Sequence, residues 1–364
     1  MEGKGATIRF TGPKWANILA GIAVVVLAIV VVASFIRIPY YAMSPGKAQP
    51  VSQLLTLPTD LVHKPRGSVL LTDVSVSDRP IRLIDLIPDW LSSNTVLVKA
   101  ADLLGPTPAN ELAAQGAWEM ETSKLSATAA ALSMLGYPVA EKNQGAVIVV
   151  VLPHSPASRA LRVGQVIVAM NGHPTPTAQQ LSKYIRAARP GERVKLLVGR
   201  VGSNKVHNIE VTLGTRARAP YLGVLITTQH SFTFPFKVGI RSDQIGGPSA
   251  GLAFALGIID ELSGGQLTGG KVVAATGTIT ASGAVGPVGG VAEKTTAVER
   301  AGAQVFIVPK EEYKQALSKA TPRLAVYPVS SLTGAIDVLK SLGGTLKLRT
   351  YHLNLSNKYP VRRE

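Results

Sequence analysis

The hydrophobic pattern of the chain is strongest near its N-terminus. No charged residue occurs between Trp15 and Ile36, a stretch of 22 residues, which as a helix spans roughly 33 Å and is long enough to cross the hydrocarbon core of a bilayer. We therefore expect a transmembrane helix at residues 15–37. Three basic residues against one acidic residue precede it, so the positive-inside rule predicts a cytoplasmic tail at residues 1–14 and a single-pass cell-membrane protein whose remaining part is extracytoplasmic. A cleaved signal peptide is the alternative, although its apolar region normally runs only ~7–15 residues.

After this helix the pattern changes to a polar stretch and then to alternating strands and helices. Residues 38–65 are rich in Pro, Ser and small polar residues, which is typical of a stalk. Gly67–Val76 has the apolar density of a strand, and Asn110–Leu135, nearly free of Gly and Pro, favours a helix. A strongly β-branched strand is expected at Gly145–Leu152, followed by a run of turn residues.

A compact module follows, in which short strands alternate with one helix. Strands are predicted at Gln165–Met170 and Arg193–Arg200, and a helix at Thr177–Ala188. The Asn171-Gly172 pair between them is a strong signal for a tight turn. This alternation predicts a small domain with its own core.

An almost wholly apolar helix pattern begins beside Ser249. The sequence SAGLAFALGIIDEL places this serine at or next to the N-terminus of a buried helix. Unpaired backbone N–H groups and the positive end of the helix dipole can stabilise a developing oxyanion there, close to the serine hydroxyl. The alternative is an ordinary Ser N-cap, which is far commoner than a nucleophile.

Lys294 lies on the apolar face of a second predicted helix. At ~100° per residue it shares that face with Val291 and Val298. The same geometry predicts Glu293 and Arg300 on the opposite face. A buried ammonium loses solvation, so its pKa falls toward neutrality and the amine can act as a general base. The alternative is a side chain that extends along the apolar face to water.

Charge and composition narrow the classes of partner. The chain has 364 residues, with 38 Lys and Arg against 22 Asp and Glu, a net charge of +16. Aromatic residues make up only 5% and do not interleave with basic ones, so we expect no nucleic-acid binding and assign the charge to anionic lipid headgroups or wall polymers. The absence of Cys excludes disulfides and thiol nucleophiles. The histidines show no metal-ligand spacing, so we expect neither a metal nor another cofactor.

Residues 119–215 resemble a PDZ domain of the bacterial type. The resemblance rests on the motifs Ser155-Pro156-Ala157, Leu161-Arg162-Val163-Gly164-Gln165-Val166-Ile167, Asn171-Gly172 and Pro190-Gly191. Gln165 stands where such domains more often show Asp. A PDZ fold implies a groove in which an extended peptide adds to a sheet edge, often through its C-terminus. Leu135-Gly136-Tyr137-Pro138 is the candidate carboxylate-binding loop, and a packed module that binds no peptide is the alternative.

Residues 218–345 look like the proteolytic domain of the Lon family. The motifs, in the order of that family, are Gly247-Pro248-Ser249-Ala250-Gly251, Thr276-Gly277-Thr278-Ile279-Thr280, Gly286-Pro287-Val288-Gly289-Gly290, Lys294 and Ala301-Gly302-Ala303. Several motifs in one order are far more specific than any single one. The resemblance implies a mixed α/β (α+β) fold of the ribosomal-protein-S5-domain-2-like kind.

The same resemblance implies a serine peptidase with a Ser–Lys dyad. Ser249 would be the nucleophile and Lys294 the general base and then the acid. Thr276 would hydrogen-bond the lysine amine. Gly247, Pro248 and Ala250 would support the serine. Gly246 stands where many Lon proteins carry Asp.

The order of these parts is similar to that of membrane-anchored, PDZ-containing Lon-like peptidases of bacteria. There the PDZ domain is inserted before the proteolytic domain, which implies that residues 38–118 form a stalk and strands joining the catalytic half, and leaves residues 346–364 as a basic tail. The implied partners are protein or peptide substrates, the membrane and further copies of the chain. Since no ATPase module is visible, we expect ATP-independent cleavage of accessible or unfolded segments.

Three other interpretations compete with this one. Gly265–Lys271 satisfies G-x-x-x-x-G-K, but Val272 replaces the Ser or Thr that would hold magnesium. Gly247–Gly251 also fits the G-x-S-x-G elbow of α/β-hydrolase esterases, with Asp337 and His352 in the required downstream order. The residues before it are polar, however, where the elbow needs a strand. The third alternative is a catalytically silent PDZ scaffold at the membrane.

Overall fold

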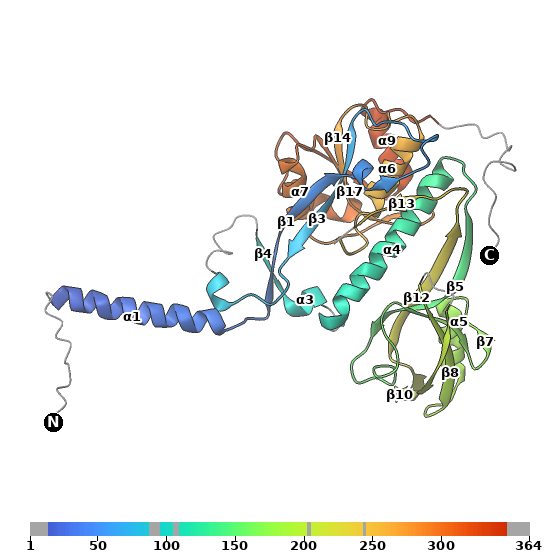
Figure 1. Cartoon of the computed structure of the whole chain (residues 1–364), viewed down its shortest axis with the longest axis horizontal. Helices are drawn as coiled ribbons and strands as arrows, with labels where there is room; N and C mark the ends of the chain where they lie inside the picture. The colour runs from blue at the N-terminus through green and yellow to red at the C-terminus, as the bar shows by residue number, and fades with distance from the viewer. Residues whose placement is uncertain (1–13, 87–94, 105–108, 202–204, 243–244, 348–364) are drawn as a thin grey trace, which may run out of the picture. The chain divides into compact units, whose positions relative to one another are not determined.

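The computed structural model of the protein divides into two compact units (Figure 1). The smaller unit is drawn from residues 1–44 and 76–103, and the larger from residues 45–75 and 104–364. The stretches that the structure describes are residues 14–86, 95–104, 109–201, 205–242 and 245–347.

The smaller unit contains the long N-terminal helix α1 (Lys14–Phe35). Its apolar side chains are exposed along its length, as Leu19 and Leu27 illustrate with 56% and 63% exposure. The predicted apolar helix is thus confirmed. It is long and apolar enough to cross a membrane, a criterion that a signal sequence near an N-terminus also meets.

A short antiparallel pairing belongs to the same unit. The first residues of β1 (Tyr40–Pro50) pair with β4 (Val96–Lys99), with Tyr40 opposite Lys99. The 3-10 helix η2 (Leu83–Asp85) packs against α1, and α3 (Ala100–Leu104) follows β4.

The larger unit contains a sheet in the order β18-β17-β14-β3-β1. Four strands run parallel, with Val69, Val273, Val305 and Ala325 side by side. They are β3 (Ser68–Val76), β14 (Val272–Ala275), β17 (Val305–Pro309) and β18 (Ala325–Val329). β3 precedes the PDZ-like residues and β14 follows them, so the chain leaves this sheet and later returns to it.

Helices cover both faces of this sheet, because successive strand side chains point to opposite sides. Ala275 and Ile307 belong to one apolar core, which they share with α4, α6 and α9. Ala274 and Phe306 belong to another, which they share with α7 and α8. The predicted mixed α/β fold is therefore confirmed. The helices are α4 (Ala109–Met134), α6 (Gly251–Leu262), α7 (Val291–Arg300), α8 (Tyr313–Leu317) and α9 (Leu332–Ser341).

A second, antiparallel sheet has its own core. Its order is β12-β5-β6-β8-β9, with β7 paired to β6. It extends past residue 215, the expected end of the module, because β12 pairs with β5 along its length. The elements are β5 (Ala140–Val151), β6 (Gln165–Met170), β7 (His173–Pro174), α5 (Ala178–Ala187), β8 (Arg193–Arg200), β9 (His207–Thr212) and β12 (Val224–Thr233).

Short elements connect these layers. They are η1 (Val51–Gln53), β2 (Leu55–Thr56), β10 (Gly214–Arg216), β11 (Ala219–Tyr221), β13 (Gly239–Ile240), β15 (Thr278–Ile279), β16 (Val285–Gly286) and η3 (Lys310–Glu312). β2 pairs with β13, β10 with β11 and β15 with β16.

Close packing of α6 against η1 gives a test of this arrangement. A Cβ added at Gly257 would lie 2.5 Å from Val51 Cγ1, and Val51 is fully buried. We expect Gly257→Ala to lower the free energy of unfolding by about 1–3 kcal/mol, because overpacking outweighs the gain in helix propensity. In a Val51→Ala background the same change should be neutral or stabilising. Denaturant unfolding of the four proteins measures this coupling, and an equal cost in both backgrounds would contradict it.

Candidate active site

Ser249 lies half-buried directly before helix α6. The N-cap position belongs to Ala250, so Ser249 is not the side-chain cap of the helix. Gly247 adopts a φ of 84°, in the left-handed region that favours glycine, and the hydroxyl of Ser123 in α4 donates to the carbonyl of Pro248 at 3.0 Å. This turn places Ser249 at the positive end of the α6 dipole.

Thr276 connects the serine segment to the parallel sheet. Its backbone N–H donates to the carbonyl of Ile307 at 3.0 Å, directly after β14. Its hydroxyl donates to the carbonyl of Ser249 at 3.2 Å, and the N–H of Gly277 donates to that same carbonyl at 2.9 Å. Because Thr276 is fully buried, these bonds fix the backbone of Ser249 against the end of the strand.

Lys294 approaches the same threonine from helix α7. The side chain is 2% exposed, and its Nζ donates to Thr276 Oγ1 at 3.3 Å. The prediction that Lys294 lies on a buried face is confirmed, and the alternative of a side chain reaching water is wrong. The structure thus joins Lys294, Thr276 and Ser249 in one chain of hydrogen bonds.

The environment of Lys294 favours its neutral form. Burial lowers its pKa from the ordinary value of 10.5 to about 8, because a desolvated ammonium is less stable than a desolvated amine. The carboxylates of Asp73, Glu312 and Glu293 act in the opposite direction and raise this pKa. Loss of solvation is the larger effect, so the amine gives up its proton not far above neutral pH.

The two charged residues predicted on the face of α7 opposite to Lys294 differ in burial. Glu293 is 6% exposed. Arg300, predicted on the same side, is exposed. Helical periodicity assigns residues to faces, but it does not say how many faces the fold covers, and α7 packs against α8 as well as the sheet.

Two competing motifs do not have the structure that their chemistry needs. Gly265–Lys271 connects helix α6 to strand β14, whereas a phosphate-binding loop leads into a helix N-terminus. The Nζ of Lys271 donates to the carbonyl of Leu342 at 2.8 Å. For the esterase interpretation, the described residues just before Ser249 form no strand, and Asp337 is exposed on α9. His352 lies outside the described residues.

The described part of the chain contains no group of three or more His, Asp and Glu side chains that could hold a metal ion. His63 Nδ1 lies 3.3 Å from the carbonyl of Glu261. His230 Nδ1 lies 2.6 Å from Glu141 Oε1. These histidines have local structural partners.

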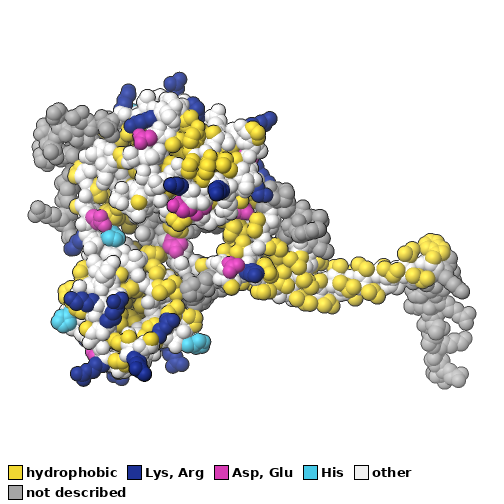
Figure 2. All heavy atoms as spheres, turned by 180° about the vertical axis from the view of Figure 1, so that it is seen from behind, with side chains coloured by type: hydrophobic (Ala, Val, Ile, Leu, Met, Phe, Trp, Pro, Cys, Tyr) yellow, Lys and Arg dark blue, Asp and Glu magenta, His cyan; other side chains and the backbone are white. Residues whose placement is uncertain are grey.

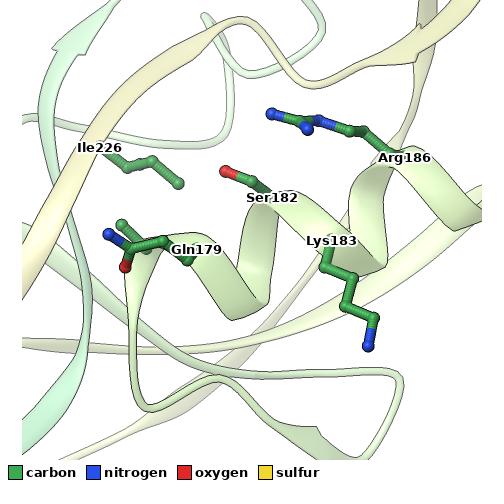
Figure 3. Close-up of a pocket in the computed structure, with 6 residues that line it drawn as sticks. Gln179, Ser182, Lys183, Arg186 and Ile226 are labelled. Atoms are coloured by element: carbon green, nitrogen blue, oxygen red, sulfur yellow. The ribbon is translucent and has the colours of Figure 1, made fainter.

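The second sheet carries a groove between α5 and β12 (Figure 3). In the described sheet β12 pairs with β5 alone, so alternate backbone N–H and C=O groups on its other edge are available to a further strand. The PDZ resemblance implied a peptide groove at a sheet edge, but sequence reasoning did not identify β12 as that edge, because β12 lies beyond the expected end of the module at residue 215. The signal that could have identified this strand is the run Val224–Thr228 at its start, in which every residue except Leu225 is β-branched. The groove is lined by Ala178, Gln179, Ser182, Lys183, Arg186 and Ile226.

The candidate carboxylate-binding loop at residues 135–138 is not part of this groove. Leu135 and Tyr137 are buried in the core that contains α6, and the Tyr137 ring packs edge-on against Phe236 at a centroid distance of 5.0 Å. That prediction is wrong, because apolar packing places the segment in the core that contains α6, apart from the core of the second sheet.

Comparison with known proteins agrees with both parts of the fold. Residues 242–337 match the Lon protease (S16) C-terminal proteolytic domain, and residues 147–200 match the PDZ domain. The Lon protease of Chloroflexus aggregans is 30% identical over 149 residues, which cover 40% of this chain and 18% of that protein. The Lon protease of Heliobacterium modesticaldum is 33% identical over 129 residues, which cover 35% of this chain and 16% of that protein.

A solved structure is also similar. The crystal structure of the PDZ domain of an SdrC-like protein from Listeria monocytogenes is 21% identical, covers 23% of this chain and 87% of that chain, and has a TM-score of 0.21. The chain spans less than a fifth of the length of the two Lon proteases named above. It contains a PDZ domain followed by a Lon-type C-terminal proteolytic domain.

Proposed function

We propose that the chain is a serine endopeptidase that hydrolyses peptide bonds in accessible or unfolded protein segments without ATP. One observation carries this proposal. The buried amine of Lys294 is hydrogen-bonded to Thr276, whose hydroxyl in turn holds the carbonyl of Ser249. The match of residues 242–337 to the Lon proteolytic domain supports the same chemistry.

In the proposed reaction the neutral amine of Lys294 takes the proton of the Ser249 hydroxyl while Oγ attacks the scissile carbonyl carbon. The N-terminal end of α6 stabilises the negative charge that develops on the carbonyl oxygen. The resulting ammonium gives its proton to the departing amine, the C–N bond breaks, and an ester remains on Ser249. A water molecule, deprotonated by the same amine, then hydrolyses this ester and restores both side chains.

Thr276 is a positioning residue in this scheme. Its hydroxyl oxygen accepts a hydrogen bond from Lys294, and the same hydroxyl donates a hydrogen bond to the carbonyl of Ser249. This arrangement orients the amine through one of its N–H bonds, and once the lysine is neutral its single lone pair accepts the serine proton. Gly247, Pro248 and Ala250 form the turn that presents the serine.

The remaining parts are proposed to bring substrate and enzyme together. Helix α1 anchors the chain in the cell membrane, and the excess of basic residues before it supports a cytoplasmic N-terminus and an extracytoplasmic catalytic part. The PDZ domain recruits or admits substrate segments through the groove along β12. The net positive charge favours contact with anionic lipid headgroups or wall polymers.

Cleavage of casein by the full chain in detergent, without ATP, tests the proposed dyad. We expect Ser249→Ala and Lys294→Ala each to lower the rate at least about a hundredfold, because a nucleophile or a general base is then missing. The matched controls are Ser341→Ala on α9 and Lys310→Ala on η3, two exposed residues whose loss should leave the rate unchanged. Equal activity in all five proteins would eliminate the dyad, and stimulation by ATP and magnesium would contradict ATP independence.

Unfolding measurements test the buried charge of Lys294 independently of catalysis. The unfolded chain keeps the lysine proton up to the ordinary pKa of 10.5, whereas the folded chain loses it near 8. Stability therefore rises with pH between these values, and the burial of the charge costs on the order of 3 kcal/mol below them. We expect Lys294→Met in a Ser249→Ala background to be more stable than its parent at pH 7, with a difference that shrinks above pH 8.

The matched control for this measurement is Lys310→Met, which alters an exposed lysine and should show no such pH dependence. A Lys294→Met protein that is less stable than its parent at pH 7 would mean that Asp73, Glu312 and Glu293 stabilise the ammonium more than burial destabilises it.

A further inference from the structure

The part of the chain that forms the second sheet is strongly basic. Residues 140–233 contain twelve Lys and Arg against three acidic residues, more than half of the net charge of +16. Figure 2 shows Lys and Arg side chains gathered over this part of the molecule. Its three acidic residues do not neutralise the groove, since Glu141 contacts His230 and Glu210 contacts Arg193, and Glu192 accepts a hydrogen bond from the backbone of Arg189.

One guanidinium faces the groove itself. In Figure 3 the side chains of Ser182 and Arg186 lie on the side of α5 that faces Ile226, while Lys183 turns away from it. Arg186 is exposed, and within the described part of the chain no carboxylate forms an ion pair with it. The groove therefore presents an unneutralised cation beside an apolar floor.

Hydrogen bonds connect the first residues of α5 to β12. Thr228 Oγ1 accepts from the backbone N–H of Ala178 at 3.1 Å and lies 3.4 Å from Gln179 Oε1. These contacts tie the N-terminus of α5 to β12. The part of the groove that contains Arg186 lies along the later turns of α5, opposite Ile226 of β12.

A second cation lies close to β11, the strand that precedes β12 in the chain. β11 ends at Tyr221, three residues before β12 begins, and packs against α5. The guanidinium carbon of Arg216 lies 5.6 Å from the centre of the Tyr221 ring. Besides Arg186 on α5, the β10–β11 hairpin that packs against this helix therefore carries a positive charge at Arg216.

We propose that the groove between α5 and β12 selects extended peptide segments that carry an Asp or Glu side chain beside Arg186. The peptide backbone would pair with the free edge of β12, while its carboxylate accepts the two parallel N–H bonds that a guanidinium offers. Small or apolar side chains would face Ile226 and Ser182. This preference rests on the proposed role of the PDZ domain in substrate recruitment and specifies which segments it would bind. Its test measures binding alone, so the preference can fail while the proposed peptidase activity holds.

The test is a binding measurement on the full chain in detergent, with Ser249→Ala present so that no peptide is cleaved. The probes are two fluorescent peptides of Thr, Ser and Val with one central Glu or Gln, both amidated at the C-terminus so that no terminal carboxylate contributes. We expect the Glu peptide to bind about fivefold more tightly at low salt. Arg186→Gln should bring this ratio close to one. Arg200→Gln, a matched change of an exposed arginine at the end of β8, should leave it unchanged.

Three results would overturn the proposal. They are the absence of a Glu preference in the parent protein, an equal loss of preference in both arginine variants, and binding of phosphatidylglycerol vesicles that depends on Arg186 while neither peptide binds. The last result would assign this basic groove to a lipid surface. Circular dichroism checks that both variants fold, which their exposed positions predict.

Discussion

The burial of the Lys294 amine away from water is the physical constraint on which the candidate site depends. A buried ammonium has lost most of its solvation, and among the described residues only Thr276 Oγ1 accepts a hydrogen bond from it. Asp73, Glu312 and Glu293 offset part of the cost without cancelling it. The fold thus holds an amine that loses its proton not far above neutral pH, and its burial costs stability that a hydrophobic residue would recover.

The parallel sheet brings Lys294 and Ser249 to the same threonine. Thr276 directly follows β14, and α6 and α7 pack on opposite faces of the sheet that contains this strand. The hydroxyl of Thr276 therefore links Lys294 on α7 to the segment before α6, although these two helices lie on opposite faces of the sheet. β3 lies beside β14 although the whole second sheet intervenes in sequence. The integrity of the site consequently depends on a strand that precedes the PDZ domain.

Sequence patterns predicted most of the elements because local periodicity determines them. The apolar run of α1, the strand Arg193–Arg200 and the buried face of Lys294 all follow from residues that are close in the chain. The burial of Glu293 and the core position of Tyr137 do not, because they depend on which distant segments cover them. The groove also depends on segments that are distant in the chain. Ser182 on α5 lies within the module predicted at residues 119–215, whereas Ile226 on β12 lies beyond its expected end.

The rate at which a fluorophosphonate probe acylates Ser249, measured against pH, tests most directly whether Lys294 acts as a neutral base. The probe reacts with an activated serine and needs no peptide substrate, so the PDZ groove does not enter the measurement. A rate that rises with pH to a plateau, with a midpoint near the lysine pKa of about 8, and that is lost in Lys294→Met is the expected result. A rate that persists in Lys294→Met with the same pH dependence would show that another group activates the serine.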